Sequence, residues 1–557
     1  MITKSQYYIL LCCIAVVYIL GIVCPVLELD SAQFSTMALR MAVENDFTHL
    51  IKGAADYLDK PHMHFWLAAL SYKIFGYSAW AYRLPTILLS ALAAYSCYGL
   101  AKLLYNKNAG LIASLVYLTA QAIVLANIDV KTDGVLTAFT IFAIWQLATY
   151  IEEGKLSAIV LGAIGTGFAF STKGQIAILV IGICLFCHLL YTRKWQRLWS
   201  WKVLVALVAF GVAVTPMLYA YYVQFDMHPE KIIRGKSDRS GIFFIFWEQS
   251  FERMSGTGMG KDHNDYFFFY HTLLWTFLPW TFIMLGGIYQ KVKSLVQVKF
   301  KYDKRYEFLT VGTILIVLQI ISFAQFKLPH YLNIIMPVLA VLTASYLVYL
   351  FEEQKVKPLK IILNLQYFVL AIIVILACFL AFVPFGLPKW YVLLFMLFVL
   401  TAIIYTIVKE QHALAKIVVL TVFAAVFTNT VMNGHFYPNL LQYQAGYVMG
   451  NKLKNENVPT QDIYKYREEF SWALDFSTKR YTPIVSLDEV KAKVNAGEAV
   501  WLYLDKKHLE DLKSEGLSYD KALETPSYRI SKLSLKFIMP STREKQLGYK
   551  YLVHITK

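Results

Sequence analysis

The sequence predicts an α-helical polytopic membrane protein with about 13 transmembrane helices and a small C-terminal α/β soluble domain. Of the 557 residues, 57% are hydrophobic and only 16% are charged. A soluble domain usually carries about 25% charged residues. Many apolar stretches approach or exceed the roughly 18–20 residues that cross a bilayer as a helix. The charge is concentrated toward the end of the chain, which predicts that the last region lies in water.

Thirteen apolar stretches are the predicted spans. The first, Tyr7–Cys24, contains no charged residue, and no cleavage pattern of small residues follows it. We therefore expect it to be a retained span and not a signal peptide. The others are 84–104, 109–126, 134–150, 157–170, 176–191, 203–222, 267–289, 308–323, 331–351, 361–383, 390–408 and 417–432.

Lysines and arginines are unevenly divided between the two sets of loops. If the N-terminus is cytoplasmic, the inner loops hold Lys102, Lys107, Arg193, Lys194, Arg197, Lys291, Lys293, Lys299, Lys301, Lys304, Arg305, Lys355, Lys357, Lys360, Lys409 and Lys416. Cytoplasmic loops of membrane proteins are enriched in such residues. We therefore expect a cytoplasmic N-terminus. The long loops 25–83 and 224–265 and the C-terminus then lie on the outer side. In the first of these loops, residues 34–43 are expected to form an amphipathic helix on the membrane surface.

The sequence divides into a transmembrane domain, residues 1–432, and an outer α/β domain, residues 433–557. In the second domain, Ser486 and Glu489 form a capping box that opens a helix to Asn495. Residues 499–504 are a strand candidate, 506–514 a second helix and 549–555 a final strand. No catalytic motif is visible in this domain.

Composition also bears on partners. The net charge is +16, but much of the positive charge lies in short loops, where membrane topology explains it. Since no nucleic-acid-binding signature is present, we expect membrane lipids and no nucleic acid as partners. The seven cysteines lie in or next to apolar spans, which argues against a disulfide framework.

Charged and aromatic residues gather at the predicted outer ends of the spans. They are Asp30, Arg40, Asp59, Lys60, His62, His64 and Arg83 in the first loop, Asp129, Lys131 and Asp133 after the third span, Lys173 after the fifth, Arg253 and His263 in the second loop, and Lys327 and His330 before the tenth. Charge at the edge of hydrocarbon is costly unless it is solvated or paired. Cations can hold a lipid phosphate and stabilise it as a leaving group, and a carboxylate can deprotonate an acceptor hydroxyl.

Several motifs then resemble one family. They are Leu29-Asp30 with Phe34, Ala38 and Arg40; Asp59-Lys60-Pro61-His62-Met63-His64-Phe65-Trp66; Ala81-Tyr82-Arg83-Leu84-Pro85; Lys131-Thr132-Asp133-Gly134; Thr172-Lys173-Gly174; the regions 248–253 and 263–280; and Phe326-Lys327-Leu328-Pro329-His330-Tyr331. In order and spacing they are similar to the GT-C-fold glycosyltransferases of the protein O-mannosyltransferase-like family. The greatest similarity is to the bacterial 4-amino-4-deoxy-L-arabinose lipid A transferases.

The resemblance implies a function. A sugar would move from a polyprenyl-phosphate-linked donor, without a nucleotide sugar and with inversion, to a lipid (lipid A-like) or protein acceptor. The location would be the outer face of a bacterial inner (plasma) membrane. Both kinds of acceptor stay open. A lipid or sugar transporter or flippase is the alternative, but that class favours charges near mid-membrane and broken helices, whereas these spans are charged mainly at their outer ends.

The resemblance also implies residue roles. Asp30 would be the catalytic carboxylate, and Asp133 would support the acceptor or orient its neighbours. The expected substrate-binding residues are Arg40, Asp59, Lys60, Arg83, Lys173, Arg253, His263, Lys327 and Tyr331; among them Lys60, Lys173 and Arg253 are candidates for the donor phosphate, and Tyr331 and Lys327 for the donor pocket. Asp59 and His263 match positions at which relatives can hold a divalent metal ion.

Some of these residues could instead have purely structural roles. The motifs also differ in places from the family pattern. Asp133 also fits a helix cap, and Lys173 a cation in a tight turn between two spans. Ser31 replaces an acid and Asp59 replaces a glutamate. These differences bear on the sugar, the acceptor and metal use more than on the reaction class.

Overall fold

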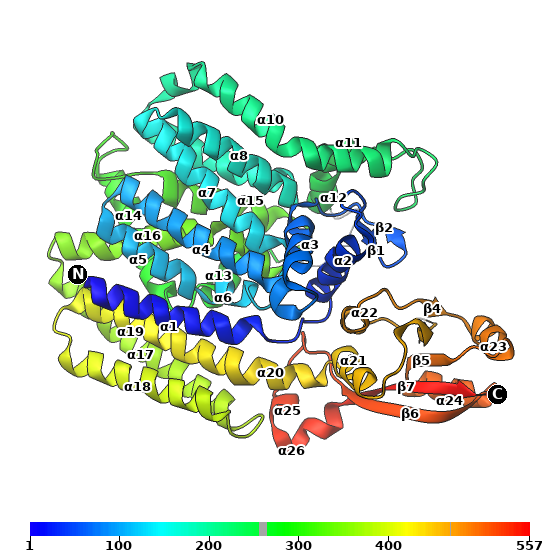
Figure 1. Cartoon of the computed structure of the whole chain (residues 1–557). Helices are drawn as coiled ribbons and strands as arrows, with labels where there is room; N and C mark the ends of the chain where they lie inside the picture. The colour runs from blue at the N-terminus through cyan, green and yellow to red at the C-terminus, as the bar shows by residue number, and fades with distance from the viewer. Residues whose placement is uncertain (256–264, 468, 557) are drawn as a thin grey trace.

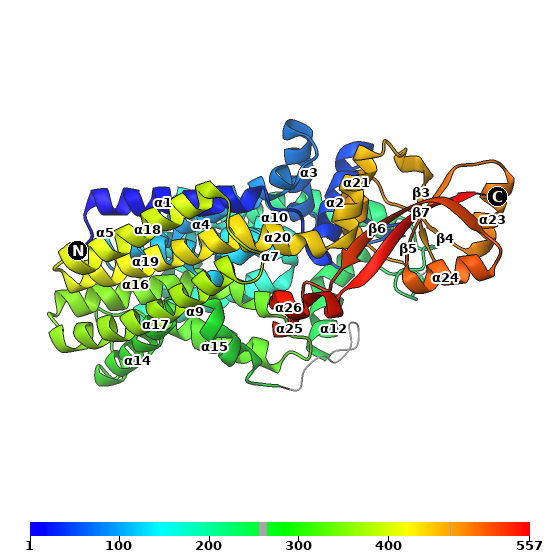
Figure 2. The same ribbon diagram turned by 90° about the horizontal axis from the view of Figure 1, so that it is seen from below.

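The computed structural model shows a bundle of long helices with a separate α/β domain at one end (Figure 1). It describes residues 1–255, 265–467 and 469–556, except for the side chains of residues 253–255. The N-terminus lies at the far end of the bundle from the C-terminal domain, as both Figures 1 and 2 show. We call the bundle end beside this domain the outer end and the opposite end the inner end.

Within the described residues, ten helices are long and apolar enough to cross a membrane. The helices of the bundle are α1 (Lys4–Ile22), α4 (Ala79–Leu104), α5 (Lys107–Thr119), α7 (Thr132–Glu153), α8 (Leu156–Lys173), α9 (Gln175–Thr192), α10 (Lys202–Tyr221), α14 (Thr281–Gln297), α15 (Leu309–Phe323), α16 (Met336–Glu352), α17 (Val356–Phe382), α18 (Trp390–Lys409) and α19 (Ala413–Val431). A helix satisfies its own backbone hydrogen bonds, which hydrocarbon requires. The chain is therefore a multi-pass membrane protein. Ten of the 13 predicted spans coincide with these ten helices, and the predicted span 308–323 coincides with the shorter apolar helix α15.

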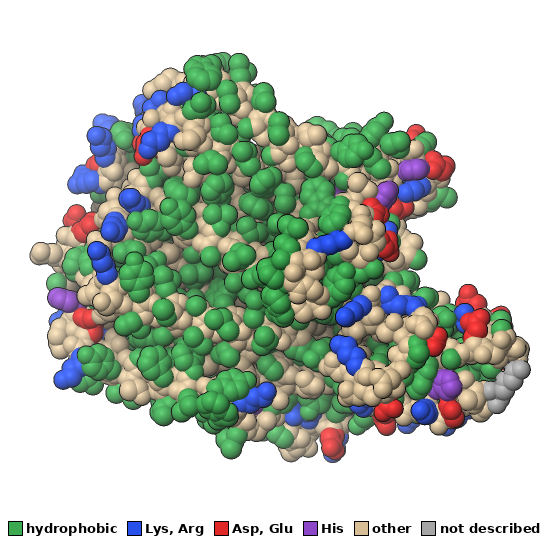
Figure 3. Space-filling model, viewed as in Figure 1, with side chains coloured by type: hydrophobic (Ala, Val, Ile, Leu, Met, Phe, Trp, Pro, Cys, Tyr) green, Lys and Arg blue, Asp and Glu red, His purple; other side chains and the backbone are tan. Residues whose placement is uncertain are grey.

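Hydrophobic side chains cover most of the bundle in Figure 3, while Lys and Arg side chains gather along its inner end. Trp199, Leu204, Ile375 and Trp390 are among the large apolar side chains that stay exposed. Exposed apolar surface of this extent marks contact with lipid.

Some predicted boundaries were wrong. The predicted span 267–289 is two helices, α13 (Phe268–Thr276) and α14, because Pro279 between them has no N–H to continue the hydrogen-bond ladder. The third predicted span also breaks, at Ala120, into α5 and α6 (Gln121–Ala126). The last span does not end at residue 432, since helical structure continues from Ala413 to Tyr443.

The first outer loop forms α2 (Asp30–Glu44), β1 (Ile51–Lys52), β2 (Ala55–Asp56) and α3 (Met63–Phe75). The predicted surface helix 34–43 is part of α2, but it is largely buried in protein and does not present an apolar face at the molecular surface. Its residues from Ser31 to Leu39 are all buried, because α2 packs against α3 and against α22 of the C-terminal domain. The second outer loop contains α11 (Gly241–Phe243) and α12 (Gln249–Ser255).

The C-terminal domain is a five-stranded mixed sheet in the order β4-β3-β5-β7-β6, flanked by helices. Its elements are α21 (Ala445–Asn455), β3 (Ile463–Tyr466), α22 (Trp472–Thr478), β4 (Ile484–Val485), α23 (Leu487–Asn495), β5 (Val500–Asp505), α24 (Lys506–Ser514), β6 (Ser518–Ser527), α25 (Leu535–Ile538), α26 (Pro540–Arg543) and β7 (Gly548–Thr556). Strands β4 and β5 run parallel to β3, and β7 is antiparallel to β5 and β6. The predicted capping box of Ser486 and Glu489 is present.

Candidate functional site

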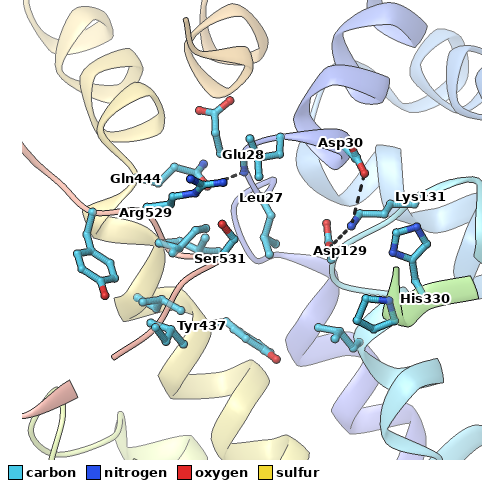
Figure 4. A pocket seen from close by; sticks show the side chains of 18 of the residues that line it. Leu27, Glu28, Asp30, Asp129, Lys131, His330, Tyr437, Gln444, Arg529 and Ser531 are labelled. Carbon is cyan, nitrogen blue, oxygen red and sulfur yellow. Dashed lines mark hydrogen bonds and ion pairs between the residues drawn. The ribbon is translucent and has the colours of Figure 1, made fainter. Parts of the chain in front are cut away.

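A cavity of about 790 Å³ lies between the outer ends of the bundle helices and the C-terminal domain. We call it the outer cavity. Its walls come from five parts of the chain that are distant in sequence: residues 27–30, the segment 122–134, Trp275 with Thr276, residues 328–333, and the region from Tyr437 through the C-terminal domain. Figure 4 shows Asp30, Asp129 and Lys131 on one side and Gln444, Arg529 and Ser531 on the other.

Asp30 is the first residue of α2, and its side chain, 47% exposed, lines the outer cavity. Its Oδ2 lies 3.7 Å from Nζ of Lys131, which also lies 3.0 Å from Oδ2 of Asp129. Burial opposes the charge of the Lys131 ammonium, but Asp129 and Asp30 outweigh it and raise its pKa above the usual value. Lys131 therefore stays positive beside Asp30. A carboxylate that is held by one loose ion pair and open to a cavity can accept a proton from a bound hydroxyl.

Asp133 and Lys173 form a buried ion pair at the same end of the bundle. Nζ of Lys173 lies 2.5 Å from Oδ1 of Asp133, with side-chain exposures of 5% and 7%. Nε2 of His330 lies 3.7 Å from the other oxygen, Oδ2. The Lys173 ammonium also lies 4.4 Å from the ring centroid of Tyr331. Four residues from three predicted motifs therefore meet here, and Asp133 and His330 face the cavity.

Two further predicted lysines lie at this end. Lys60 lies in electrostatic range of Asp133 and His330. Lys327 is buried, with its ammonium 5.4 Å from the ring centroid of Tyr266. Lys60, Lys173 and Lys327 therefore concentrate positive charge at this end of the bundle, which suits the binding of an anionic group.

The second outer loop adds an ion-pair network. Nη1 of Arg234 lies 3.0 Å from Oδ1 of Asp59 and 2.8 Å from Oε2 of Glu252. Arg239 binds Glu248 and Glu252. Two predicted site residues lie outside this description: the structure does not describe the side chain of Arg253, and it does not describe His263 at all.

Of the two predicted metal ligands, Asp59 and His263, Asp59 lies within the described residues. An arginine cation already occupies Oδ1 of that carboxylate. Among the residues with described positions, a cluster of metal-ligand type is formed by Glu469, Asp505 and His508 in the C-terminal domain. There, Nζ of Lys550 lies 2.6 Å from Oε2 of Glu469, so this cluster also carries its own cation.

Two predicted arginines are placed away from the outer cavity. Arg83 is fully buried and donates to the backbone carbonyls of Ile128 at 3.0 Å and Pro25 at 2.7 Å, and also to those of Ile22 and Cys24. Arg40 pairs with Glu44 at 2.6 Å and Asp46 at 3.2 Å. Both fix the first loop, and neither lines the cavity.

Sequence reasoning missed Glu28, Gln444 and Arg529, which all line the outer cavity. Glu28 stands two residues before Asp30, but its partners are more than 400 residues away, so no local pattern marks it. Arg529 follows strand β6 in a domain without a recognisable motif. Among the Lys and Arg side chains that line the cavity, Lys131 and Lys550 have carboxylate partners, whereas Arg529 has none among the described residues.

Comparisons with known proteins agree with this picture. Residues 59–219 match the model of the dolichyl-phosphate-mannose-protein mannosyltransferase family. The undecaprenyl phosphate-alpha-4-amino-4-deoxy-L-arabinose arabinosyl transferase 2 of Proteus mirabilis is 25% identical over 377 residues, which are 65% of this chain and 64% of that one. The corresponding Yersinia pestis transferase is 24% identical over 354 residues, 62% and 60% of the two chains. The match therefore spans less than two thirds of these relatives' length.

The fold is shared along nearly the whole chain. The crystal structure of ArnT from Cupriavidus metallidurans bound to undecaprenyl phosphate superposes with a TM-score of 0.74 at 16% identity, covering 99% of this chain and 98% of that one. The apo state of the same protein gives 0.73 at 15% identity. The resemblance to the GT-C-fold glycosyltransferases is thus confirmed, and this chain has the ArnT fold from its first span through its C-terminal domain.

Proposed function

We propose that this protein is an integral-membrane glycosyltransferase that moves a sugar from a polyprenyl-phosphate carrier to an acceptor at the outer face of the membrane. The single observation that carries the proposal is the half-exposed Asp30 carboxylate. It faces a cavity that Asp133 and His330 also line, in a protein with the fold of a structure that binds undecaprenyl phosphate. The relatives' names refer to the same kind of donor.

In the proposed reaction, the carboxylate of Asp30 and the nearby lysines have different roles. An acceptor hydroxyl oxygen attacks the anomeric carbon of the carried sugar and forms the new glycosidic bond. The bond between that carbon and the phosphate oxygen breaks, and the phosphate leaves on its lipid carrier. Asp30 takes the hydroxyl proton, and Lys60 and Lys173 stabilise the charge that develops on the phosphate. Direct displacement of this kind inverts the anomeric centre.

We propose a lipid as the acceptor, bound at the half of the outer cavity that the C-terminal domain forms. This half contains Arg529 together with the hydroxyls of Ser531 and Tyr528. Trp275 and Leu533 add apolar surface and are 44% and 41% exposed. An arginine without a carboxylate partner beside hydroxyl groups suits a phosphate on a sugar headgroup. The apolar side chains suit the acyl region of the same molecule.

The orientation of the protein supports the same assignment. Basic residues such as Lys102, Arg193 and Lys355 are at or near the inner ends of their helices, and the positive-inside rule puts that end in the cytoplasm. The outer cavity then faces the periplasm of a bacterial inner membrane. Reporter fusions at the inner loop 193–201 and at the C-terminus check this, with cytoplasmic and periplasmic signals expected respectively.

The test is a transfer assay with the purified protein in proteoliposomes. Undecaprenyl-phosphate sugars serve as donors, lipid A or a peptide as acceptor, and products are measured by mass spectrometry. We expect Asp30→Asn to lower kcat by about 10²–10⁴-fold, the contribution of a general base. Glu44→Gln is the matched control, because Glu44 is an exposed carboxylate on the same helix.

Three results would contradict the proposal. Transfer by Asp30→Asn at the wild-type rate would show that Asp30 is not the general base. Transfer to the peptide but not to lipid A would replace the lipid acceptor by a protein. Movement of the donor to the other leaflet without any glycosylated product would indicate a flippase.

A further inference from the structure

Glu28 connects the first loop to the C-terminal domain directly before Asp30. Its carboxylate accepts hydrogen bonds from Oγ of Ser471 at 2.7 Å, from the N–H of Trp472 at 2.7 Å and from that of Ala473 at 3.2 Å. The N–H groups of Trp472 and Ala473 are the first backbone donors of helix α22, and such donors have no partners within the helix. The carboxylate therefore caps a helix that belongs to another domain.

Gln444 holds the same stretch from a second side. Its Oε1 accepts from the N–H of Glu28 at 2.7 Å, and its Nε2 donates to the carbonyl of Val26 at 2.8 Å. Gln444 is buried. The backbone of residues 26–28 is thus fixed by Gln444, which lies between the helical extension of the last span and α21, and the side chain of Glu28 by α22.

Leu29, between this clamp and Asp30, has a strained backbone. Its φ is +73° and its ψ is −127°, a region that glycine adopts readily and a leucine rarely. The Leu29 side chain is 43% exposed, so its own packing does not compensate the strain. On the other side of Leu29, the first turn of α2 is closed by the hydrogen bonds from Ala32 N–H to the carbonyl of Leu27 and from Gln33 N–H to that of Leu29, both 2.9 Å.

We infer that the C-terminal domain positions Asp30 through Glu28, by holding Leu29 in a conformation that it would otherwise leave. Glu28 is a positioning residue and does not touch the reacting atoms. The inference rests on the proposed function for its effect on turnover. It assigns the C-terminal domain a part in catalysis that no motif within that domain indicates.

The physical reason is that the direction of the Asp30 side chain depends on the turn at Leu29. Without Glu28, a leucine at this position relaxes toward negative φ, and the start of α2 rotates with it. Asp30 then moves relative to Lys131. A displacement of about 1 Å in an active site can lower the rate by roughly 100-fold, while donor binding at Lys60 and Lys173 stays unaffected.

The experiment is a double-mutant cycle on the full-length protein. We expect Glu28→Ala to lower kcat by about 10- to 100-fold with an unchanged KM for the donor. Adding Leu29→Gly should restore part of that kcat, because glycine adopts this positive φ without strain and so no longer needs the clamp to reach it. Glu28→Gln should retain part of the activity, since its amide oxygen can still accept from the N–H groups of Trp472 and Ala473.

The matched control is Glu489→Ala. Glu489 also caps a helix of the C-terminal domain, by accepting a hydrogen bond from the N–H of Ser486, but its helix α23 lies away from α2 and α3 of the first loop (Figures 1 and 2). It should lower the melting temperature of the domain and leave kcat unchanged. If Glu28→Ala acted only by loosening the domain, Glu489→Ala would lower kcat as well and Leu29→Gly would not restore it, which would overturn the inference. An unchanged kcat in Glu28→Ala would also overturn it.

Hydrogen–deuterium exchange separates this inference from the proposed function. In Glu28→Ala the amides of residues 29–34 should exchange faster than in the wild type, with little change around Glu489. If these amides exchange faster in Glu28→Ala but the wild-type protein transfers no sugar, the structural role of Glu28 is supported and the proposed function is rejected. Unchanged exchange would reject the clamp whatever the activity.

Discussion

Both ends of the helical bundle contain a buried lysine–carboxylate pair, but the two pairs have different surroundings. At the inner end, Lys291 lies 3.3 Å from Glu307. The same carboxylate accepts from the N–H of Thr310 at 2.8 Å and its hydroxyl at 2.6 Å, and from the hydroxyl of Tyr105. At the outer end, Asp133 has Lys173 at 2.5 Å and His330 at 3.7 Å, and it faces a cavity.

The difference separates a structural pair from a functional candidate. Burial and charge are alike in the two places, since all four side chains are at most 10% exposed. The Glu307 carboxylate is surrounded by protein donors and has its hydrogen-bonding capacity filled. The Asp133 carboxylate borders space that a substrate can enter. Access to a cavity therefore distinguishes the two carboxylates better than their burial does, since at the inner end only Lys291 of the pair lines a cavity, a smaller one of about 280 Å³.

The strongest test of this difference is to replace each ion pair by apolar residues. Such replacements are often neutral for stability when both charges are removed together. We expect Asp133→Leu/Lys173→Met to fold and to lose transfer by about 10²–10³-fold, the contribution of a preorganised charged group. Glu307→Leu/Lys291→Met should fold and keep kcat. Equal activity losses in the two double variants, measured in the transfer assay, would remove the distinction.

Removing a single charge at the inner end tests the structural side. Glu307→Gln leaves Lys291 without a counter-charge, which costs about 3–5 kcal/mol for a buried pair. We expect a lower melting temperature in detergent and an unchanged kcat for the protein that remains folded. A lowered kcat at an unchanged melting temperature would give the inner pair a direct role in the reaction.

Arg529 extends the comparison to the opposite wall of the outer cavity. Arg529→Ala should raise the KM for lipid A by roughly 10- to 100-fold, equivalent to the 1.5–3 kcal/mol of a hydrogen bond to a charged group, and leave kcat unchanged. Dephosphorylated lipid A should show no such change. Lys532→Ala is the control, because Lys532 is an exposed neighbour that does not line the cavity. An equal KM change for both acceptors would contradict phosphate binding.

The smallest effect is expected from divalent ions. Since Arg234 already pairs with Asp59, stripping the protein with a chelator should leave kcat unchanged. A loss of activity that zinc or manganese restores would show that a metal ion displaces Arg234. The measurement is the transfer rate before and after chelation and after adding each ion back.

The sequence predicted those parts of the fold that local physics determines. Long apolar stretches identify spans, because hydrocarbon requires about 20 apolar helical residues. In the C-terminal domain, helix α24 has the predicted bounds, since Asp505 caps it and accepts from the N–H of His508. The extension of the last span to Tyr443 was missed, because Asn433 and His435 suggest a helix end but are buried by tertiary contacts.

The candidate site was predictable in residue type but not in partners. The motifs identified Asp30, Asp133 and Lys173, which the structure brings to one end of the bundle. They also included Arg83, whose guanidinium instead donates to four backbone carbonyls, three between the end of α1 and the start of the first loop and one in the segment before α7. A motif contains no information on whether a cation meets a ligand or the protein's own backbone. Glu28 and Arg529 were missed because only tertiary structure relates them to Asp30.

The bonds that hold Glu28 have a consequence for how the protein is made. They join positions 416 and 443 residues apart, so residues 471–473 must be synthesised before the first loop can acquire its final shape. A nascent chain that has inserted every span but not yet released residues 471–473 has its aspartate unclamped. If this clamp positions Asp30 as inferred, a chain becomes competent for transfer only after its C-terminal domain has folded against the first loop.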